Sequence, residues 1–232
     1  MINKTLIICP TKDRVNLCRR MMFSVYATKS ASTDIIFIVS DKDKMTDNYS
    51  DLFEQYNTRY HIFPFDNITE IFNNTLLLYP GYKYYHLTND DFFYQTQNWD
   101  QIFIDKIEQK GGSGIAYGND LLTGQDMPTA PFISSDIVRM LGWLQMPKLK
   151  FLYGDAVWKV IGSKLNKLYY CKDVIIRHDH PFFKNGQHDD TSKITNSKEM
   201  YEHDHSAFKD WIQNDYLNDI KKIEEELNVN KG

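Results

Sequence analysis

The sequence has few cysteines and no long hydrophobic segment, and both absences exclude classes of protein. Its three cysteines, Cys9, Cys18 and Cys171, match neither a disulfide framework nor a zinc-binding spacing, so we expect reduced thiols. The apolar run at residues 6–8 is much shorter than the roughly 18 residues that cross a bilayer, and also too short for the core of a secretion signal. We therefore expect a protein with no membrane segment, located in the cytoplasm.

A strong excess of one charge is also missing. Lysine and arginine number 27 against 31 aspartates and glutamates, so the net charge is −4 and the chain has no basic signature for nucleic-acid binding. The lysines between Lys148 and Lys167 form the one local basic candidate, for which an ordinary solvated surface is the simpler interpretation. The chain does have size and apolar content, because 42% of its 232 residues are hydrophobic and 14% are aromatic. This suffices for one large α/β domain with a helical tail.

Strand-like and helix-like segments alternate, which indicates an α/β fold with a mixed, mostly parallel sheet flanked by helices. The first apolar run, residues 5–9, is expected to end at Pro10, and a polar loop and an amphipathic segment then complete the start of a βαβ unit. Residues 132–144 fit either a capped helix or a strand followed by a helix. Strands are predicted at 5–9, 34–41, 60–64, 84–88, 115–118 and 169–176, and helices at 15–25, 46–57, 67–79, 99–107, from 154 and from 198.

The remaining segments are predicted to be loops and a terminal extension. Residues 119–131 are rich in glycine, proline and aspartate and read as a long loop, and residues 182–197 are polar and irregular. We expect residues 1–197 to form the main domain. Residues 198–232 should form a helical tail that packs back on the same domain, because its apolar residues are spaced to bury one face.

The most unusual stretch joins an aromatic strand to two adjacent carboxylates. Residues 84–88 are β-prone, and Asn89, Asp90 and Asp91 follow directly at the tip. Such a tip contributes little to a core. Carboxylates are hard oxygen ligands, however, and Mg²⁺ or Mn²⁺ binds one or two of them together with substrate phosphates. The motif therefore predicts a site where a divalent cation is held against a phosphate group.

Two further polar clusters stand at the ends of predicted elements. Gly154 and Asp155 head an apolar helical pattern, where the helix dipole keeps a carboxylate ionised and suited to act as a base. His178 and His180 follow a β-like run, and their spacing of two places both side chains on one face. Taken alone, the acidic tip also fits a turn, Gly154 and Asp155 fit a helix N-cap, and the histidine pair fits a surface loop. Together they fit a metal–diphosphate site with a nearby base.

Polar residues also follow the first two predicted strands and interrupt a helix. The loop from Pro10 to Arg14, like Asp41, lies at the carboxyl end of a strand, where parallel sheets bind ligands. Asp41 either accepts from a ribose hydroxyl or a base N–H, or caps a turn. Asn73 and Asn74 lie in the middle of a predicted helix, where asparagine is mildly unfavourable. This makes Asn74 a candidate for a polar contact to a cofactor.

The order of these motifs resembles that of the GT-A-fold, nucleotide-sugar-dependent glycosyltransferases, in particular the small family-2-like enzymes of bacteriophages and bacteria. The resemblance rests on the sequence Pro10-Thr11-x-x-Arg14, the acid after the second strand, the acidic tip, Gly-Asp-x-x-Trp and His-x-His-Pro. It extends from Ile7 to about Trp211. It implies a Rossmann-like sheet, a Mn²⁺ or Mg²⁺ ion, a UDP-sugar as donor, and the host cytoplasm as location if a phage encodes the protein.

The resemblance also assigns roles to individual residues. Asp155 would be the catalytic base of an inverting displacement, in which it deprotonates the acceptor hydroxyl as the nucleoside diphosphate leaves. Asp91 would bind the metal, and His178 or His180 would complete the metal shell. Residues in contact with the nucleotide-sugar would be Pro10, Thr11, Arg14, Asp41, Asn89 and Asp90.

The acceptor and two other activities stay open at this point. The resemblance suggests a hydroxymethylated base in phage DNA, a glycan or a protein as acceptor, and the acidic composition does not favour DNA. One alternative is a metal-dependent hydrolase with His178 and His180 as ligands. Another is a non-catalytic module that binds a sugar or a partner, because Asn89 stands where the family's first acid would be. Four aromatic side chains fit either stacking on a sugar or the core: Phe92, Phe93, Tyr94 and Trp158.

Overall fold

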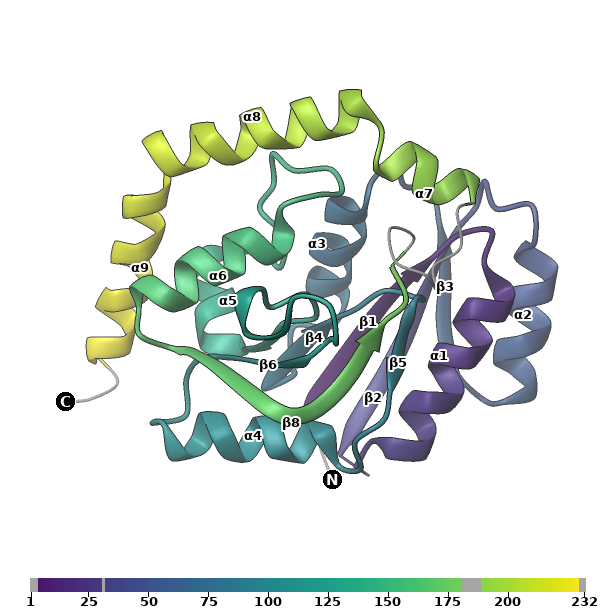
Figure 1. Cartoon of the computed structure of the whole chain (residues 1–232), viewed down its shortest axis with the longest axis horizontal. Helices are drawn as coiled ribbons and strands as arrows, with labels where there is room; N and C mark the ends of the chain where they lie inside the picture. Colours follow the sequence, from purple (N-terminus) through teal and green to yellow (C-terminus); the bar gives the residue numbers. More distant parts are fainter. Residues whose placement is uncertain (1–3, 31, 181–188, 230–232) are drawn as a thin grey trace.

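A computed structural model describes residues 4–30, 32–180 and 189–229, and it has an α/β architecture (Figure 1). The strands are β1 (Thr5–Thr11), β2 (Thr33–Ser40), β3 (Arg59–Phe63), β4 (Tyr84–Leu87), β5 (Phe92–Tyr94), β6 (Ile115–Asn119), β7 (Phe132–Ser134) and β8 (Leu168–His178). They form one eight-stranded sheet with the order β3-β2-β1-β4-β7-β6-β8-β5. The first four strands in this order pair in parallel, as do β6 and β8, whereas β7 and β5 are antiparallel to their neighbours.

Helices cover both faces of the sheet. One face carries α1 (Val15–Thr28), α2 (Thr46–Gln55) and α4 (Trp99–Gln109). The other face carries α3 (Ile68–Leu78), α5 (Ser135–Leu141), α6 (Gly154–Lys164), α8 (Lys198–Asn214) and α9 (Tyr216–Val229). Two short helices, η1 (Gly124–Asp126) and α7 (Asp190–Thr195), lie in the connections that follow β6 and β8. Figure 1 shows α8 running across the top of the molecule, with α9 turning down from its far end.

The central strands explain why the molecule has two hydrophobic layers. Ile7 and Ile35 lie in the cluster formed with α1, α2 and α4, while their neighbours Leu6 and Ile36 lie in the cluster on the opposite face. All four side chains are buried. Because helices cover both faces, these strands read as continuous apolar runs, which is the pattern that predicted a parallel sheet.

The prediction that Pro10 ends the first strand is wrong, because β1 continues to Thr11. The N–H of Thr88 donates to the carbonyl of Ile8, so Ile8 faces β4. Pro10 lies two residues further and faces the same side, but β4 pairs with residues 5–8 only. The N–H that proline lacks is therefore not needed by a neighbouring strand at this position.

Three other boundaries differ from the expectation or resolve an alternative. β5 was not predicted, and it pairs antiparallel with the end of β8. Residues 132–144 contain a strand followed by a helix, which is one of the two predicted alternatives. Residues 182–197 are not irregular throughout, because Asp189 caps α7 by accepting from the Ser192 N–H. Residues 182–188 of that segment lie outside the described part of the chain.

The C-terminal segment forms two helices, α8 and α9. α8 has Ser197 as its N-cap, and this side chain accepts from the Met200 N–H. Trp211 from α8, with Ile220 and Ile223 from α9, belongs to the same hydrophobic cluster as α3, α5 and α6. The C-terminal helices and the preceding segment therefore share one apolar layer.

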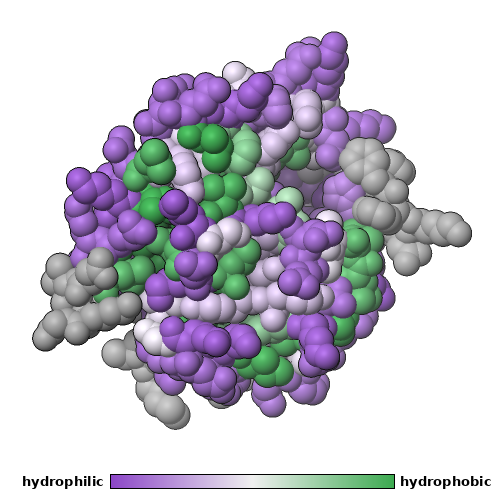
Figure 2. Space-filling model, turned by 60° about the vertical axis from the view of Figure 1, so that its left-hand side comes forward, coloured by the Kyte–Doolittle hydropathy of each residue, from purple (hydrophilic) through white to green (hydrophobic). Residues whose placement is uncertain are grey.

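Three further features of the described residues are the apolarity of the helices, the hydropathy of the surface and the state of the cysteines. None of the helices in the described ranges has the length and apolarity needed to cross a lipid bilayer. The face shown in Figure 2 is mostly hydrophilic, with hydrophobic residues in separate patches. Cys9, Cys18 and Cys171 are free thiols, the first two buried and the third partly buried.

Candidate functional site

The carboxyl ends of β1 and β4 bring two sequence motifs together. Thr11, at the end of β1, donates a hydrogen bond to Asp90 Oδ2 at 2.7 Å. The Thr11 hydroxyl also lies 2.9 Å from the hydroxyl of Tyr49, which accepts from the Arg14 N–H at 2.8 Å. Because parallel strands end at one edge of a sheet, the Pro-Thr-x-x-Arg loop meets the Asn-Asp-Asp tip there. Asn89 in that tip is partly exposed.

Arg14 is the centre of an ion-pair network. Its Nε and Nη2 atoms donate to the two carboxylate oxygens of Asp189 at 2.6 and 2.7 Å, and Nη1 donates to Asp90 Oδ1 at 3.2 Å. Only 11% of the Arg14 side chain is exposed. Burial opposes the charge, but the hydrogen bond with Asp189 and the charges of Asp90 and Asp91 raise the pKa of Arg14. This bidentate pair holds the start of α7 beside the strand ends.

The two adjacent carboxylates at the tip of β4 differ electrostatically. Burial raises the pKa of Asp90 to about 7, against the attraction of Arg14. Burial also acts to raise the pKa of Asp91, but the interactions with His178 and Arg14 lower it below its ordinary value. Asp91 therefore carries its charge at neutral pH, whereas Asp90 is the carboxylate held by hydrogen bonds from Thr11 and Arg14. Asp91 is the better metal ligand of the two.

The Asp91 carboxylate faces the end of β8. Its Oδ1 atom is buried, has no hydrogen-bond partner among the described residues, and lies 3.5 Å from His178 Nε2. The His178 ring stacks on Phe92 with centroids 4.2 Å apart, and the His178 N–H donates to the carbonyl of Asp120. The His180 ring lies edge-on to that of His178, with centroids 5.1 Å apart. Both histidines thus lie on one side of the chain.

This donor set fits a divalent cation. A buried carboxylate oxygen without a partner is costly unless a positive group binds it. Within the described residues, no three histidine, cysteine, aspartate or glutamate side chains form a group that could hold a metal ion by themselves. Mg²⁺ and Mn²⁺ nevertheless need few protein ligands where diphosphate oxygens and water complete the shell. Asp91 and His178 are the residues that would hold the ion.

Asp155 lies in the first turn of α6, where its Oδ1 accepts from the Ala156 N–H at 2.8 Å. Burial raises the pKa of Asp155, while this backbone hydrogen bond and the charge of His178 partly oppose the rise. The charge of Asp120 raises it further. The charges that act on Asp155 therefore include that of His178, a metal candidate at the end of β8. A carboxylate with a raised pKa is a stronger general base.

α8 holds the segment that leads into Asp155. Asp204 is fully buried and accepts hydrogen bonds from three consecutive backbone N–H groups. These belong to Lys150, Phe151 and Leu152, at 2.9, 2.8 and 2.7 Å respectively. A charged acceptor shared by three donors fixes a loop more firmly than neutral hydrogen bonds do. The C-terminal helices therefore contribute to the position of Asp155.

Tyr153 lies between that loop and α6 and has a left-handed backbone with φ of 67°. This conformation is strained for a residue other than glycine, so surrounding contacts hold it. Its hydroxyl lies 2.9 Å from His205 Nδ1, and its ring stacks on Phe208 with centroids 5.2 Å apart. Both partners belong to α8, which therefore sets the direction in which α6 and Asp155 begin.

We expect Asp204→Asn to destabilise the protein although the side-chain volume is conserved. One acceptor oxygen becomes an NH₂ group that faces backbone N–H donors, and an unpaired buried N–H costs about 1–3 kcal/mol. The free energy of unfolding from urea denaturation should fall by about 2 kcal/mol. The control Asp210→Asn, on the same helix, removes a surface ion pair with Lys148 and should cost less than about 1 kcal/mol. Equal stability of the two variants would contradict this role for Asp204.

Asp41 and Asn74 are not brought into the cluster. Asp41 is exposed, and its N–H donates to the Phe63 carbonyl at 3.1 Å. Asn74 is exposed in the middle of α3. In the described part of the chain, neither side chain is hydrogen-bonded to another candidate residue. Asp43 is instead buried and accepts from the Asp13 N–H at 2.6 Å, which fixes the loop after β1.

The aromatic candidates for sugar stacking are mostly core residues. Phe93 is partly exposed and packs between the guanidinium groups of Arg20 and Arg177, which lie 5.9 and 4.9 Å from its ring centre. Both arginines also form ion pairs with the buried Asp179. Phe93 therefore packs in a cluster with Arg20, Arg177 and Asp179. The other three side chains are buried in the core: Phe92, Tyr94 and Trp158.

No family model matches the sequence, and no curated protein matches it. Solved structures do match the fold. The mannosyltransferase PcManGT from Pyrobaculum calidifontis, in complex with GDP-Man and Mn²⁺, superposes with a TM-score of 0.67 and 10% sequence identity. The match covers 99% of this chain and 75% of that chain. The chain has a GT-A fold.

Two other matched structures support the GT-A fold. S. aureus TarS in complex with UDP-GlcNAc matches with a TM-score of 0.59 and 10% identity, over 86% of this chain and 64% of that chain. The glucosyl-3-phosphoglycerate synthase from Mycobacterium tuberculosis, with Mn²⁺, UDP-Glc and phosphoglyceric acid, matches with a TM-score of 0.57 and 9% identity. This match covers 77% of this chain and 72% of that chain. The structural superposition establishes the GT-A fold. At identities this low it shows the fold alone, so the activity has to be argued from the site.

Proposed function

We propose that the protein is a metal-dependent glycosyltransferase that moves a sugar from a nucleotide-diphosphate sugar to a hydroxyl group. The observation that carries the proposal is the buried Oδ1 atom of Asp91, which has no hydrogen-bond partner among the described residues and lies 3.5 Å from His178 Nε2 at the strand ends of a GT-A fold. The matched structures contain GDP-Man, UDP-GlcNAc or UDP-Glc. We propose the same donor class here, with a UDP-sugar as the first choice.

The proposed reaction is an inverting displacement with Asp155 as the base. Asp155 takes the proton of the acceptor hydroxyl while the hydroxyl oxygen forms a bond to the anomeric carbon of the donor. The bond from that carbon to the diphosphate oxygen breaks on the opposite side, and its electron pair leaves with the nucleoside diphosphate. The raised pKa of Asp155 supports this role, because it strengthens the carboxylate as a base.

The proposed ligands of the metal are Asp91 and His178, with His180 beside them. Mn²⁺ suits this set better than Mg²⁺, because Mg²⁺ strongly prefers oxygen ligands and one donor here is an imidazole nitrogen. When bound, the ion neutralises charge that develops on the leaving diphosphate. Asp90 accepts hydrogen bonds from Thr11 and Arg14. We propose that these three residues shape the nucleotide pocket.

The acceptor is proposed to be a carbohydrate hydroxyl rather than a hydroxymethylated base in phage DNA. A DNA acceptor needs a continuous basic surface that contacts phosphates. Lys148, at one end of the candidate lysine patch, is instead held by Asp210 and Asp215 at 2.7 and 3.1 Å. These ion pairs remove one of the few lysines that a DNA-binding surface would use.

Nucleotide binding that depends on Mn²⁺ is the direct test. We expect UDP or a UDP-sugar to raise the melting temperature in the presence of Mn²⁺, and much less in its absence. A ligand at about 100 times its Kd stabilises the folded state by about 2.7 kcal/mol. For a chain of this size, that corresponds to an increase of roughly 5–10 °C. Differential scanning fluorimetry measures the shift. A parallel measurement with GDP and Mn²⁺ tests whether the nucleotide is a uridine or a guanosine diphosphate.

Two results would contradict the proposal. Stabilisation by Mn²⁺ alone, together with phosphoester hydrolysis, would favour a hydrolase that uses the histidine pair. Nucleotide binding without transfer or hydrolysis of any nucleotide-sugar would favour a non-catalytic module. The donor screen should therefore include hydrolysis of each nucleotide-sugar in the absence of an acceptor.

A further inference from the structure

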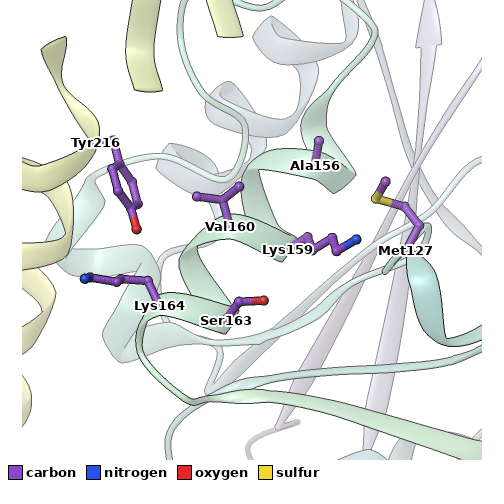
Figure 3. A pocket seen from close by; sticks show the side chains of 7 residues that line it. All are labelled: Met127, Ala156, Lys159, Val160, Ser163, Lys164 and Tyr216. Atoms are coloured by element: carbon purple, nitrogen blue, oxygen red, sulfur yellow. The ribbon is translucent and has the colours of Figure 1, made fainter. Parts of the chain in front are cut away.

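One face of α6 borders a surface cavity of about 590 Å³. Five of its lining residues belong to α6, and Met127 and Tyr216 close it from the connection after η1 and from the start of α9. Figure 3 shows these side chains arranged around the cavity, with Lys159 and Ser163 on one side of α6 and Lys164 near Tyr216. The cavity contains none of the residues assigned above to the metal or the nucleotide.

Helix geometry connects this cavity to the proposed base. Asp155, Lys159 and Ser163 recur every four residues, so their side chains form one stripe along α6. With a rise of about 1.5 Å per residue, Lys159 lies about 6 Å and Ser163 about 12 Å beyond Asp155 along the helix axis. Asp155 is not itself a lining residue, but its neighbour Ala156 is, so a molecule with a hydroxyl at Asp155 would extend along this stripe into the cavity. The adjacent stripe also lines it: Ala156, Val160 and Lys164.

The cavity is positive although the whole chain carries a net charge of −4. Its lining includes Lys159 and Lys164 and no aspartate or glutamate. Among the residues that the structure describes, neither lysine forms an ion pair, whereas Lys148 is held by Asp210 and Asp215. Two lysines without acidic partners in one concave surface favour an anionic ligand.

We propose that this α6 cavity is the acceptor subsite and that it selects a carbohydrate bearing a phosphate or carboxylate group. The inference rests on the proposed glycosyltransferase function and names its acceptor class. The reactive hydroxyl lies at Asp155 and the anionic group lies nearest Lys159, while Lys164, on the other flank of α6, adds positive charge to the cavity. Asp155 repels the anionic group and Lys159 attracts it, so these two charges fix the direction of the acceptor along the stripe. Val160 and Tyr216 supply apolar surface for the faces of sugar rings.

The test is equilibrium binding of matched oligosaccharides that differ only in a neutral, carboxylated or phosphorylated terminus, with UDP and Mn²⁺ present. We expect the anionic members to bind more tightly than the neutral one. Lys159→Gln and Lys164→Gln should each weaken anionic binding by about threefold to tenfold and leave neutral binding unchanged. Comparison of the carboxylated and phosphorylated members identifies the anionic group. The matched control is Lys110→Gln, at the end of α4 on the opposite face of the sheet, which should bind every member as the wild type does.

Equal binding of neutral and anionic members would overturn the proposal, as would unchanged affinity in the double variant Lys159→Gln/Lys164→Gln. Tighter binding of a DNA duplex with hydroxymethylated bases than of any oligosaccharide would also overturn it. Hydrolysis of the UDP-sugar without acceptor separates the two levels of inference. If both lysine variants hydrolyse the UDP-sugar at the wild-type rate and also bind the acceptors with wild-type affinity, only the inference of an acceptor subsite is refuted. If the wild-type protein binds no nucleotide-sugar, the proposed function itself is refuted.

Discussion

Asp155→Asn is expected to reduce glycosyl transfer by about 10²–10⁴-fold, the usual contribution of a general base. The substitution keeps the side-chain volume and leaves an oxygen that can accept from the Ala156 N–H, so the start of α6 should persist. What is lost is the ability to take the proton of the acceptor. Steady-state transfer from a UDP-sugar in the presence of Mn²⁺ gives kcat/KM, and the affinity for UDP should be unchanged.

The pH dependence gives this prediction a second readout. Burial raises the pKa of Asp155 above the ordinary value of 3.8, and the base acts only when ionised. The wild-type kcat/KM should therefore fall as the pH decreases through that raised pKa, and this limb should be absent from the residual activity of Asp155→Asn. The control Asp173→Asn changes an exposed carboxylate on β8 and should keep both rate and pH profile. A normal rate in Asp155→Asn, or an unchanged limb, would assign the base to another group.

Most of the sheet was predictable because its central strands are buried on both faces and read as apolar runs. β5 was not, since three residues, Phe92–Tyr94, are too short to show a strand pattern. Its conformation depends on pairing with the end of β8, which is distant in the sequence. Pro10 was misjudged for a related reason, because the cost of a proline in a strand depends on whether the neighbouring strand is still paired there.

The candidate site was predictable where strand order alone brings motifs together, as for Thr11 and Asp90. Asp189 was missed, although an aspartate three residues before Ser192 is a helix N-cap pattern, because its partner Arg14 comes from the other end of the chain. The mid-helix asparagines illustrate a further limit. Asn73 makes the polar contact, accepting from two backbone N–H groups after α5, whereas its neighbour Asn74 is exposed. Local propensity cannot distinguish adjacent residues whose roles depend on packing.

Asp91→Asn is expected to remove the Mn²⁺-dependent part of nucleotide binding. The variant loses the charged oxygen that lies 3.5 Å from His178 Nε2, while the side chain keeps its volume. Residues that only orient metal ligands cost about 10–100-fold in metal affinity when replaced, so loss of a ligand should cost at least about 100-fold. Scanning fluorimetry with UDP, with and without Mn²⁺, measures the effect as a difference within each variant. Any general change in stability then cancels.

Asp90→Asn is the matched variant, because it changes the neighbouring buried carboxylate in the same way. The contacts of Asp90 are hydrogen bonds from Thr11 and Arg14. Its replacement should therefore lower the stability of the protein without ligands and preserve most of the Mn²⁺ dependence. Asp91→Asn should show the opposite pattern, because the pKa of Asp91 is lowered and its Oδ1 atom has no hydrogen-bond partner among the described residues. If Asp90→Asn abolishes the Mn²⁺ effect while Asp91→Asn retains it, the metal ligand is Asp90, and the pairing of Asp91 with His178 is structural.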